Sequence, residues 1–85
     1  MKTLVLVNSR GREVFRAEEE KKYPDTYSVL HDGGDSGRGH FLPRRDMLLS
    51  AAHALLDAPS AKASGELAEE FARFCKRHAL FRKLV

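Results

Sequence analysis

The first 42 residues carry short apolar runs separated by turn-forming residues, a pattern typical of β-strands. Residues 3–8 contain the run Leu-Val-Leu-Val, which has no polar residue within it and predicts a strand covered on both faces. Residues 12–17 alternate between two sides and predict a half-exposed strand, which a turn at 8–11 joins to the first strand. Residues 26–31 and 40–42 predict a third strand and a short fourth strand.

The second half of the chain changes to a helical period. Apolar residues at positions 48, 51, 52 and 55 predict a helix from about Pro43 to Asp57. Pro43 suits the first turn of this helix, because its missing N–H would have no partner there. Asp46 lies near the positive end of the helix dipole, which favours the same boundary.

A longer apolar stripe predicts a second helix, from Ser60 or Ser64 as the N-cap to about Leu84. The stripe repeats at intervals of 4, 3, 4, 3 and 4 residues, which indicates a seam that packs on the sheet or on the first helix. Its members are Leu67, Phe71, Phe74, His78, Phe81 and Val85.

Together these patterns predict an α+β fold, because the strands and helices are segregated rather than alternating. We expect a small antiparallel sheet of three to four strands, covered on one face by two C-terminal helices, with Phe71 and Phe74 buried against the sheet. We expect one domain over residues 1–85, with a β-rich half at 1–42 and a helical half at 43–85.

Length and composition exclude several protein classes. A chain of 85 residues cannot form a two-domain enzyme with separate cofactor and substrate lobes. The single cysteine, Cys75, excludes a disulfide framework within the chain. The first apolar run has only four residues, and no stretch approaches the roughly 20 apolar residues of a membrane helix. We therefore expect a cytoplasmic protein without a membrane partner.

Charge is concentrated in the second half of the chain. Residues 1–42 carry seven basic and seven acidic side chains, whereas residues 43–85 carry eight basic and five acidic ones. After Glu70 there are five cations and no acid. Such a segment attracts nucleic acid or an acidic protein surface. It is equally typical of a solvated helix end, where cations oppose the negative end of the helix dipole.

A glycine-rich loop at 32–39 contains the one motif with catalytic associations. Its Gly-Asp-Ser-Gly segment, with Ser36 as the serine, resembles the nucleophile motif of chymotrypsin-like serine proteases. The resemblance covers four residues, Arg38 follows where that family has glycine, and two β-barrels do not fit in this chain. We therefore expect no enzyme. The loop is expected to become ordered only on a partner, with Arg38 reaching a phosphate or carboxylate.

Metal and cofactor sites are not expected. His31 and His40 flank the glycine loop and lack an obvious third ligand. Cys75 and His78 lie three residues apart beside the apolar stripe, which more often indicates a buried small hydrophobe and a boundary residue.

The outer face of the predicted second helix is the strongest candidate contact surface. Leu80 and Leu84 would point away from the apolar stripe, among basic side chains, and would act as apolar anchors while the cations steer association. The alternative is a frayed terminal turn. With the loop arginine, the predicted partner-binding residues are Arg73, Lys76, Arg77, Leu80, Lys83, Leu84 and Arg38.

These observations favour a non-enzymatic protein-binding module. In size and build the chain resembles phage- or mobile-element-encoded inhibitors of bacterial defence complexes, the anti-CRISPR type, and this resemblance implies a protein or nucleoprotein partner. The alternative is a small basic nucleic-acid-binding protein or regulator. Against it, the acids of the second helix share the polar face with its cations and absorb part of their field. A monomer and a homodimer both fit.

Overall fold

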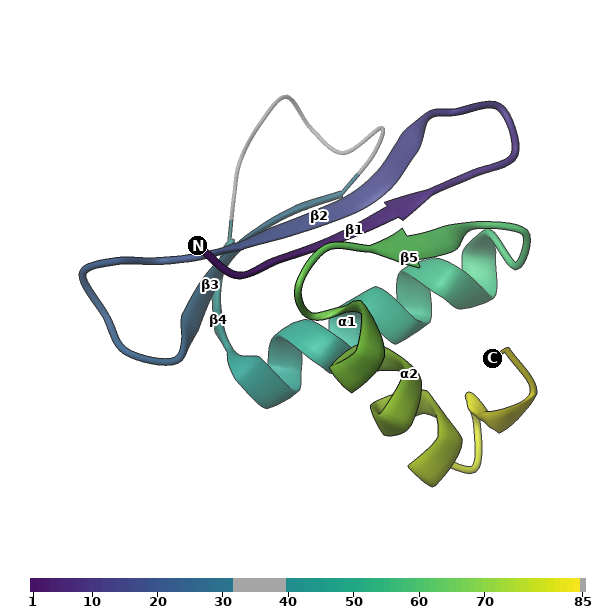
Figure 1. Cartoon of the computed structure of the whole chain (residues 1–85). Coiled ribbons are helices and arrows are strands. Elements are labelled where there is room, and N and C mark those ends of the chain that lie inside the picture. The colour runs from purple at the N-terminus through teal and green to yellow at the C-terminus, as the bar shows by residue number, and fades with distance from the viewer. Residues whose placement is uncertain (32–39, 85) are drawn as a thin grey trace.

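A computed structural model describes residues 1–31 and 40–84, which form a compact α+β domain. The predicted glycine loop, Ser36 and Arg38 lie outside the described residues, as does Val85. The strands form one antiparallel sheet in the order β4-β3-β2-β1-β5, and both helices cover the same face (Figure 1). The elements are β1 (Thr3–Val7), β2 (Glu13–Glu19), β3 (Thr26–His31), β4 (His40–Pro43), α1 (Arg44–Asp57), β5 (Lys62–Ser64), α2 (Ala68–Arg77) and a 3₁₀ turn, η1 (Arg82–Leu84).

The predicted hairpin between the first two strands is confirmed, and Asn8 holds its turn. The side-chain Oδ1 of Asn8 accepts the backbone N–H groups of Arg10 (2.9 Å) and Arg12 (3.0 Å). Gly11 has φ +81°, a conformation that glycine adopts without steric cost. This turn sets the register in which Leu4 faces Ala17 and Leu6 faces Phe15.

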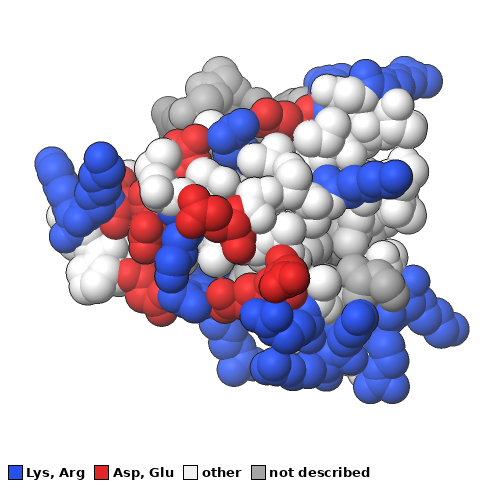
Figure 2. All heavy atoms as spheres, in the orientation of Figure 1, with Lys and Arg blue, Asp and Glu red and all other residues white. Residues whose placement is uncertain are grey.

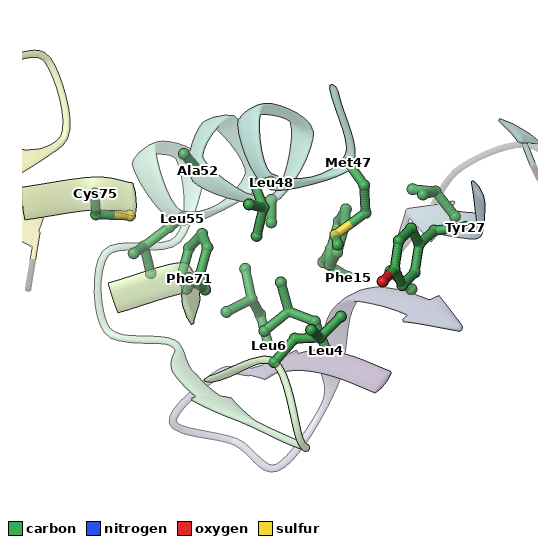
Figure 3. Packing of buried hydrophobic residues seen from close by; sticks show 14 of the residues in the cluster. Leu4, Leu6, Phe15, Tyr27, Met47, Leu48, Ala52, Leu55, Phe71 and Cys75 are labelled. Carbon is green, nitrogen blue, oxygen red and sulfur yellow. The ribbon is translucent and has the colours of Figure 1, made fainter. Parts of the chain in front are cut away.

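That register places apolar side chains on the face toward the helices. Leu4 and Leu6 of β1 are fully buried there. On the opposite face Val5 is buried at 8% exposed, whereas Thr3 and Val7 are half-buried and no helix covers them, so the strand is fully covered on one face only. Figure 3 shows Leu4 and Leu6 opposite Leu48 of α1, with Phe71 of α2 beside them. The core is therefore the layer between the sheet and the two helices.

The first helix follows its predicted stripe. Leu48, Ala51, Ala52 and Leu55 are all buried, together with Met47. The helix begins one residue later than predicted, because Pro43 is the last residue of β4 and the N-cap of α1, with φ −61° and ψ 160°. Its extended backbone turns the chain from the sheet edge directly into the helix.

The sheet has five strands rather than three or four. The additional strand, β5, lies at Lys62–Ser64, where the sequence suggested the cap of the second helix. It pairs antiparallel with β1, Val5 facing Ser64 and Val7 facing Lys62. Its three residues are exposed and have little strand propensity, so backbone pairing with β1 determines its conformation.

The prediction of one helix reaching Leu84 is wrong. α2 ends at Arg77, His78 is extended, and the chain turns back through η1. The reversal buries Phe81 completely, with its ring 4.6 Å from that of His78 and 5.4 Å from that of His53 on α1. Burial of this ring against α1 favours the reversed conformation of the chain.

The second helix begins later than predicted because of Gly65. This residue has φ +98°, and the backbone N–H of Leu67 then donates to the carbonyl oxygen of Thr3 at 3.0 Å. Phe71 is buried, as predicted, whereas Phe74 is only half-buried at the margin of the core. In the described part of the chain, no helix combines the length and apolar character needed to cross a bilayer.

Candidate binding site

Basic side chains gather over α2 and the C-terminal turn. We call this region the basic surface, and all its members are exposed. Figure 2 shows Lys and Arg concentrated at the lower edge, where Figure 1 places α2 and η1. The basic surface consists of Arg73, Lys76, Arg77, Leu80, Arg82 and Lys83.

Most cations of the basic surface have no ion-pair partner among the described residues. Arg73 approaches Glu69 at 3.8 Å, but both side chains are well exposed, so this pair neutralises little of the local field. Lys76 and Arg77 also occupy the last turn of α2, where they oppose the negative end of the helix dipole. The remaining positive charge is available to an external anion.

The structure separates the two leucines predicted as anchors. Leu80 is 68% exposed, whereas Leu84 is half-buried against the core. The predicted helix face that would carry both is absent, because α2 ends at Arg77 and the chain reverses. Leu80 therefore remains beside the cations as the exposed apolar side chain, while Leu84 contributes to packing.

A groove of about 480 Å³ lies between the start of α1 and the outer side of α2. We call it the α1–α2 groove. From α1 it is lined by Arg44, Arg45 and Leu48, and from α2 by Glu70, Phe74 and Arg77. His78 and Asp25 complete the lining. A smaller hollow that includes Arg73 continues it along α2, so the groove opens onto the basic surface.

One wall of the α1–α2 groove is an ion-pair network centred on Arg44. Its Nε donates to Oδ1 of Asp25 at 2.8 Å, and its Nη1 donates to both carboxylate oxygens of Glu70 at 3.1 and 3.2 Å. The hydrogen bond to Asp25 and then that to Glu70 raise the pKa of Arg44. Arg44 therefore stays charged and compensates both acids of the groove.

The other two arginines of the groove have no described ion-pair partner. Arg45 and Arg77 are exposed and form no ion pair with any described residue. Phe74 supplies a half-buried ring, with its centroid 5.9 Å from that of His78. The Nδ1 atom of His78 is buried and has no hydrogen-bond partner among the described residues. The groove thus combines free guanidinium groups, an aromatic surface and an unsatisfied polar atom.

Cys75 is a core residue in this structure. It is fully buried, and burial raises the pKa of its thiol, so the reactive thiolate is disfavoured. His78 is half-buried, as expected for a boundary position. Within residues 1–31 and 40–84, no three His, Cys, Asp or Glu side chains come together in a geometry that could hold a metal ion.

The helix-free face of the sheet carries a second exposed apolar feature. Phe41 of β4 is 63% exposed and Leu30 of β3 is 39% exposed. Phe41 pairs with Ser28, two residues before Leu30, so the two apolar side chains are diagonal neighbours on one face. Arg16 lies on the same face and is held by Glu13 and Glu18 at 2.9 and 3.0 Å, which leaves this face without free positive charge from β2.

Sequence reasoning identified Arg73 and Arg77 but missed most of the α1–α2 groove. Arg44 and Glu70 are 26 positions apart, and no local pattern links them. Arg45 belongs to no periodic pattern and has no charged partner near it in the sequence that would indicate a role. Phe41 was detectable, since it alternates with the half-buried Leu42 in the predicted fourth strand. No family model, curated protein or solved structure matched this chain.

Proposed function

We propose that this protein is a non-enzymatic protein-binding module that docks through the basic surface on an acidic patch of a partner protein. The observation that supports this proposal is a set of exposed cations without strong internal partners, which precede and follow the 68% exposed Leu80 in the chain. Arg16 and Arg44 are neutralised by ion pairs, whereas Lys and Arg side chains are concentrated at this edge of the molecule (Figure 2).

The two kinds of side chain serve different steps of association. Rim cations raise the rate at which an oppositely charged partner is encountered, whereas an apolar anchor slows dissociation. Leu80 lies beside the cations and is free to enter an apolar pocket on the partner. The specific form we propose is a small phage- or mobile-element-encoded inhibitor of a bacterial defence complex, anti-CRISPR-like, acting in the cytoplasm on a protein or nucleoprotein. Its small size and α+β build support this form.

The test begins with affinity capture from bacterial extract, with and without nuclease, followed by kinetics with the purified partner. Lys76→Glu combined with Arg77→Glu reverses two charges of the basic surface. Lys21→Glu combined with Lys22→Glu reverses two exposed charges of the β2–β3 connection and is the matched control. We expect the first variant to lower the association rate at least about tenfold at low salt, and the control to leave it within about twofold.

Leu80→Ala is expected to raise the dissociation rate while leaving the melting temperature at the wild-type value, because Leu80 is exposed. Normal partner binding by the charge-reversed variant would mean that the basic surface is only a solvated helix end. Loss of capture on nuclease treatment, with an affinity that falls steeply with salt, would assign the basic surface to nucleic acid instead.

A further inference from the structure

We propose that the α1–α2 groove is a binding site for a small phosphomonoester that carries a planar ring. In this arrangement Arg45 and Arg77 hold the phosphate, and the ring lies against Phe74. This site shares Arg77 with the basic surface, but it takes a small molecule and also depends on Arg45 of α1, which is not part of the basic surface, so an Arg45 variant tests it apart from the protein-docking role.

The charge of the groove favours an anion. Its acids, Asp25 and Glu70, are both engaged by Arg44, whose three hydrogen bonds to them are 2.8 to 3.2 Å long. They therefore oppose an incoming anion far less than free carboxylates would. Arg45 and Arg77 keep their guanidinium donors free of described ion-pair partners. A phosphomonoester has three terminal oxygens and a charge of about −1.5 to −2, so it can accept paired hydrogen bonds from two arginines and balance both charges, whereas a carboxylate has two oxygens and one charge.

The apolar part of the groove favours a ring. Phe74 and Leu48 line it, and Phe74 is half-buried, so its ring is fixed against the core and still presents a surface. A planar ring stacked on Phe74 would gain apolar burial and an aromatic contact. The volume of about 480 Å³ lies within the usual range for small-molecule sites and exceeds the need of a bare inorganic ion.

A second aromatic side chain extends the ring-binding surface. His78 also lines the groove, and its ring centroid lies 5.9 Å from that of Phe74. The two rings together offer a planar ligand a larger contact surface than Phe74 alone.

The experiment compares four probes by isothermal titration calorimetry and backbone-amide NMR on the full chain: adenosine monophosphate, phenyl phosphate, inorganic phosphate and adenosine. We expect each ring-bearing phosphate to bind at least about tenfold more tightly than inorganic phosphate or adenosine. The NMR shift changes should concentrate on Leu48, Phe74 and His78. Equal affinity for adenosine monophosphate and inorganic phosphate, or no binding of any probe at millimolar concentration, would overturn the proposal.

Variants identify the residues responsible. Arg45→Gln and Arg77→Gln are each expected to weaken adenosine monophosphate binding about tenfold, because each removes one charged donor pair. Arg10→Gln removes an exposed cation of the β1–β2 turn, outside the groove, and should change affinity less than twofold. Equal weakening by all three variants would indicate nonspecific attraction to a basic protein and would overturn the site. Phe74→Leu should lower the affinity for phenyl phosphate to that for inorganic phosphate. If Phe74→Leu fails to fold, the Arg45 and Arg77 variants decide the result, because both side chains are exposed and their replacement should not affect folding.

Discussion

Tyr27 lies in the core with no side-chain surface exposed, yet its hydroxyl has no hydrogen-bond partner among the described residues. A buried hydroxyl without a partner loses its interactions with water and gains nothing in return. Burial raises the pKa of this hydroxyl, and the nearby Arg44 opposes the shift only in part. Tyr27 therefore stabilises the fold through burial of its ring, while its unpaired hydroxyl lowers the stability.

Replacing Tyr27 by Phe should raise the free energy of unfolding at neutral pH by about 1 kcal/mol, because the ring is kept and the unsatisfied oxygen is removed. The same change should also alter how the free energy of unfolding depends on pH in the alkaline range. In the wild type, the folded state holds the phenolic proton to higher pH than the unfolded chain does, so stability falls as pH rises above about 10. Tyr27→Phe removes this contribution. Urea denaturation at pH 7 and in the alkaline range measures both effects, and a less stable variant at pH 7 would contradict the argument.

At the scale of elements, Gly65 connects the β5 edge to α2 through a close backbone contact. A Cβ atom at this position would lie 2.5 Å from the carbonyl oxygen of Thr3, the same oxygen that accepts the N–H of Leu67. Gly11 has a similar positive φ in the hairpin turn, but a Cβ there would meet no atom within 4 Å. An alanine at Gly11 therefore costs stability only through its backbone conformation, whereas an alanine at Gly65 adds a steric clash with Thr3.

Gly11→Ala should lower the free energy of unfolding by about 1 kcal/mol, the usual penalty for a left-handed non-glycine residue. Gly65→Ala should cost at least about 2–3 kcal/mol, because the backbone of β1 or the start of α2 must also shift. Chemical denaturation of both variants gives the comparison. If the two losses are equal, the contact between Gly65 and Thr3 is not important for stability.

The elements with strong local patterns were predictable, and those that depend on distant backbone were not. The stripe at Leu48, Ala51 and Leu55 predicted α1 because its period matches the face that is buried. β5 was missed because its pairing with β1 comes from the opposite end of the chain. The break after Arg77 was missed because Phe74, His78 and Phe81 do meet, as their spacing indicated, but through a turn rather than along one helix.

The same limit applies to the candidate site. The sequence showed the excess of cations after Glu70, since charge composition needs no geometry. It did not show that Arg44 neutralises Glu70, or that Arg45 lies in the same groove as Arg77. Those relations depend on the packing of α1 against α2, which only the folded chain defines.

For the molecule as a whole, Arg44 joins three parts of the fold. It stands at the start of α1, contacts Asp25 in the turn before β3, and contacts Glu70 on α2. Asp25 has φ +56°, and its carbonyl oxygen also accepts the N–H of Arg44 at 3.1 Å. Arg16 has ion pairs of similar length, but with Glu13 and Glu18 of its own strand.

Arg44→Met keeps the aliphatic stem and removes the network, and we expect it to lower the free energy of unfolding by about 1–2 kcal/mol, with exposed pairs contributing at most about 1 kcal/mol each. Arg16→Met, the control, should cost less, because it joins no separate elements. High salt should narrow the difference between each variant and the wild type. Urea denaturation at low and high salt provides the measurement. A loss for Arg44→Met no larger than that for Arg16→Met would show that the network does not hold the layers together.

The position of β1 between β2 and β5 also affects how the nascent chain is protected from aggregation. β2 follows β1 directly in the chain, so both strands of this pair leave the ribosome early, but the other edge of β1 has no partner until residues 62–64 emerge. An open edge on a Leu-Val-Leu-Val strand is a template for pairing with other chains. The short, exposed β5 thus closes a surface that would otherwise promote aggregation, and chains that stall during translation before residue 62 leave that surface uncovered.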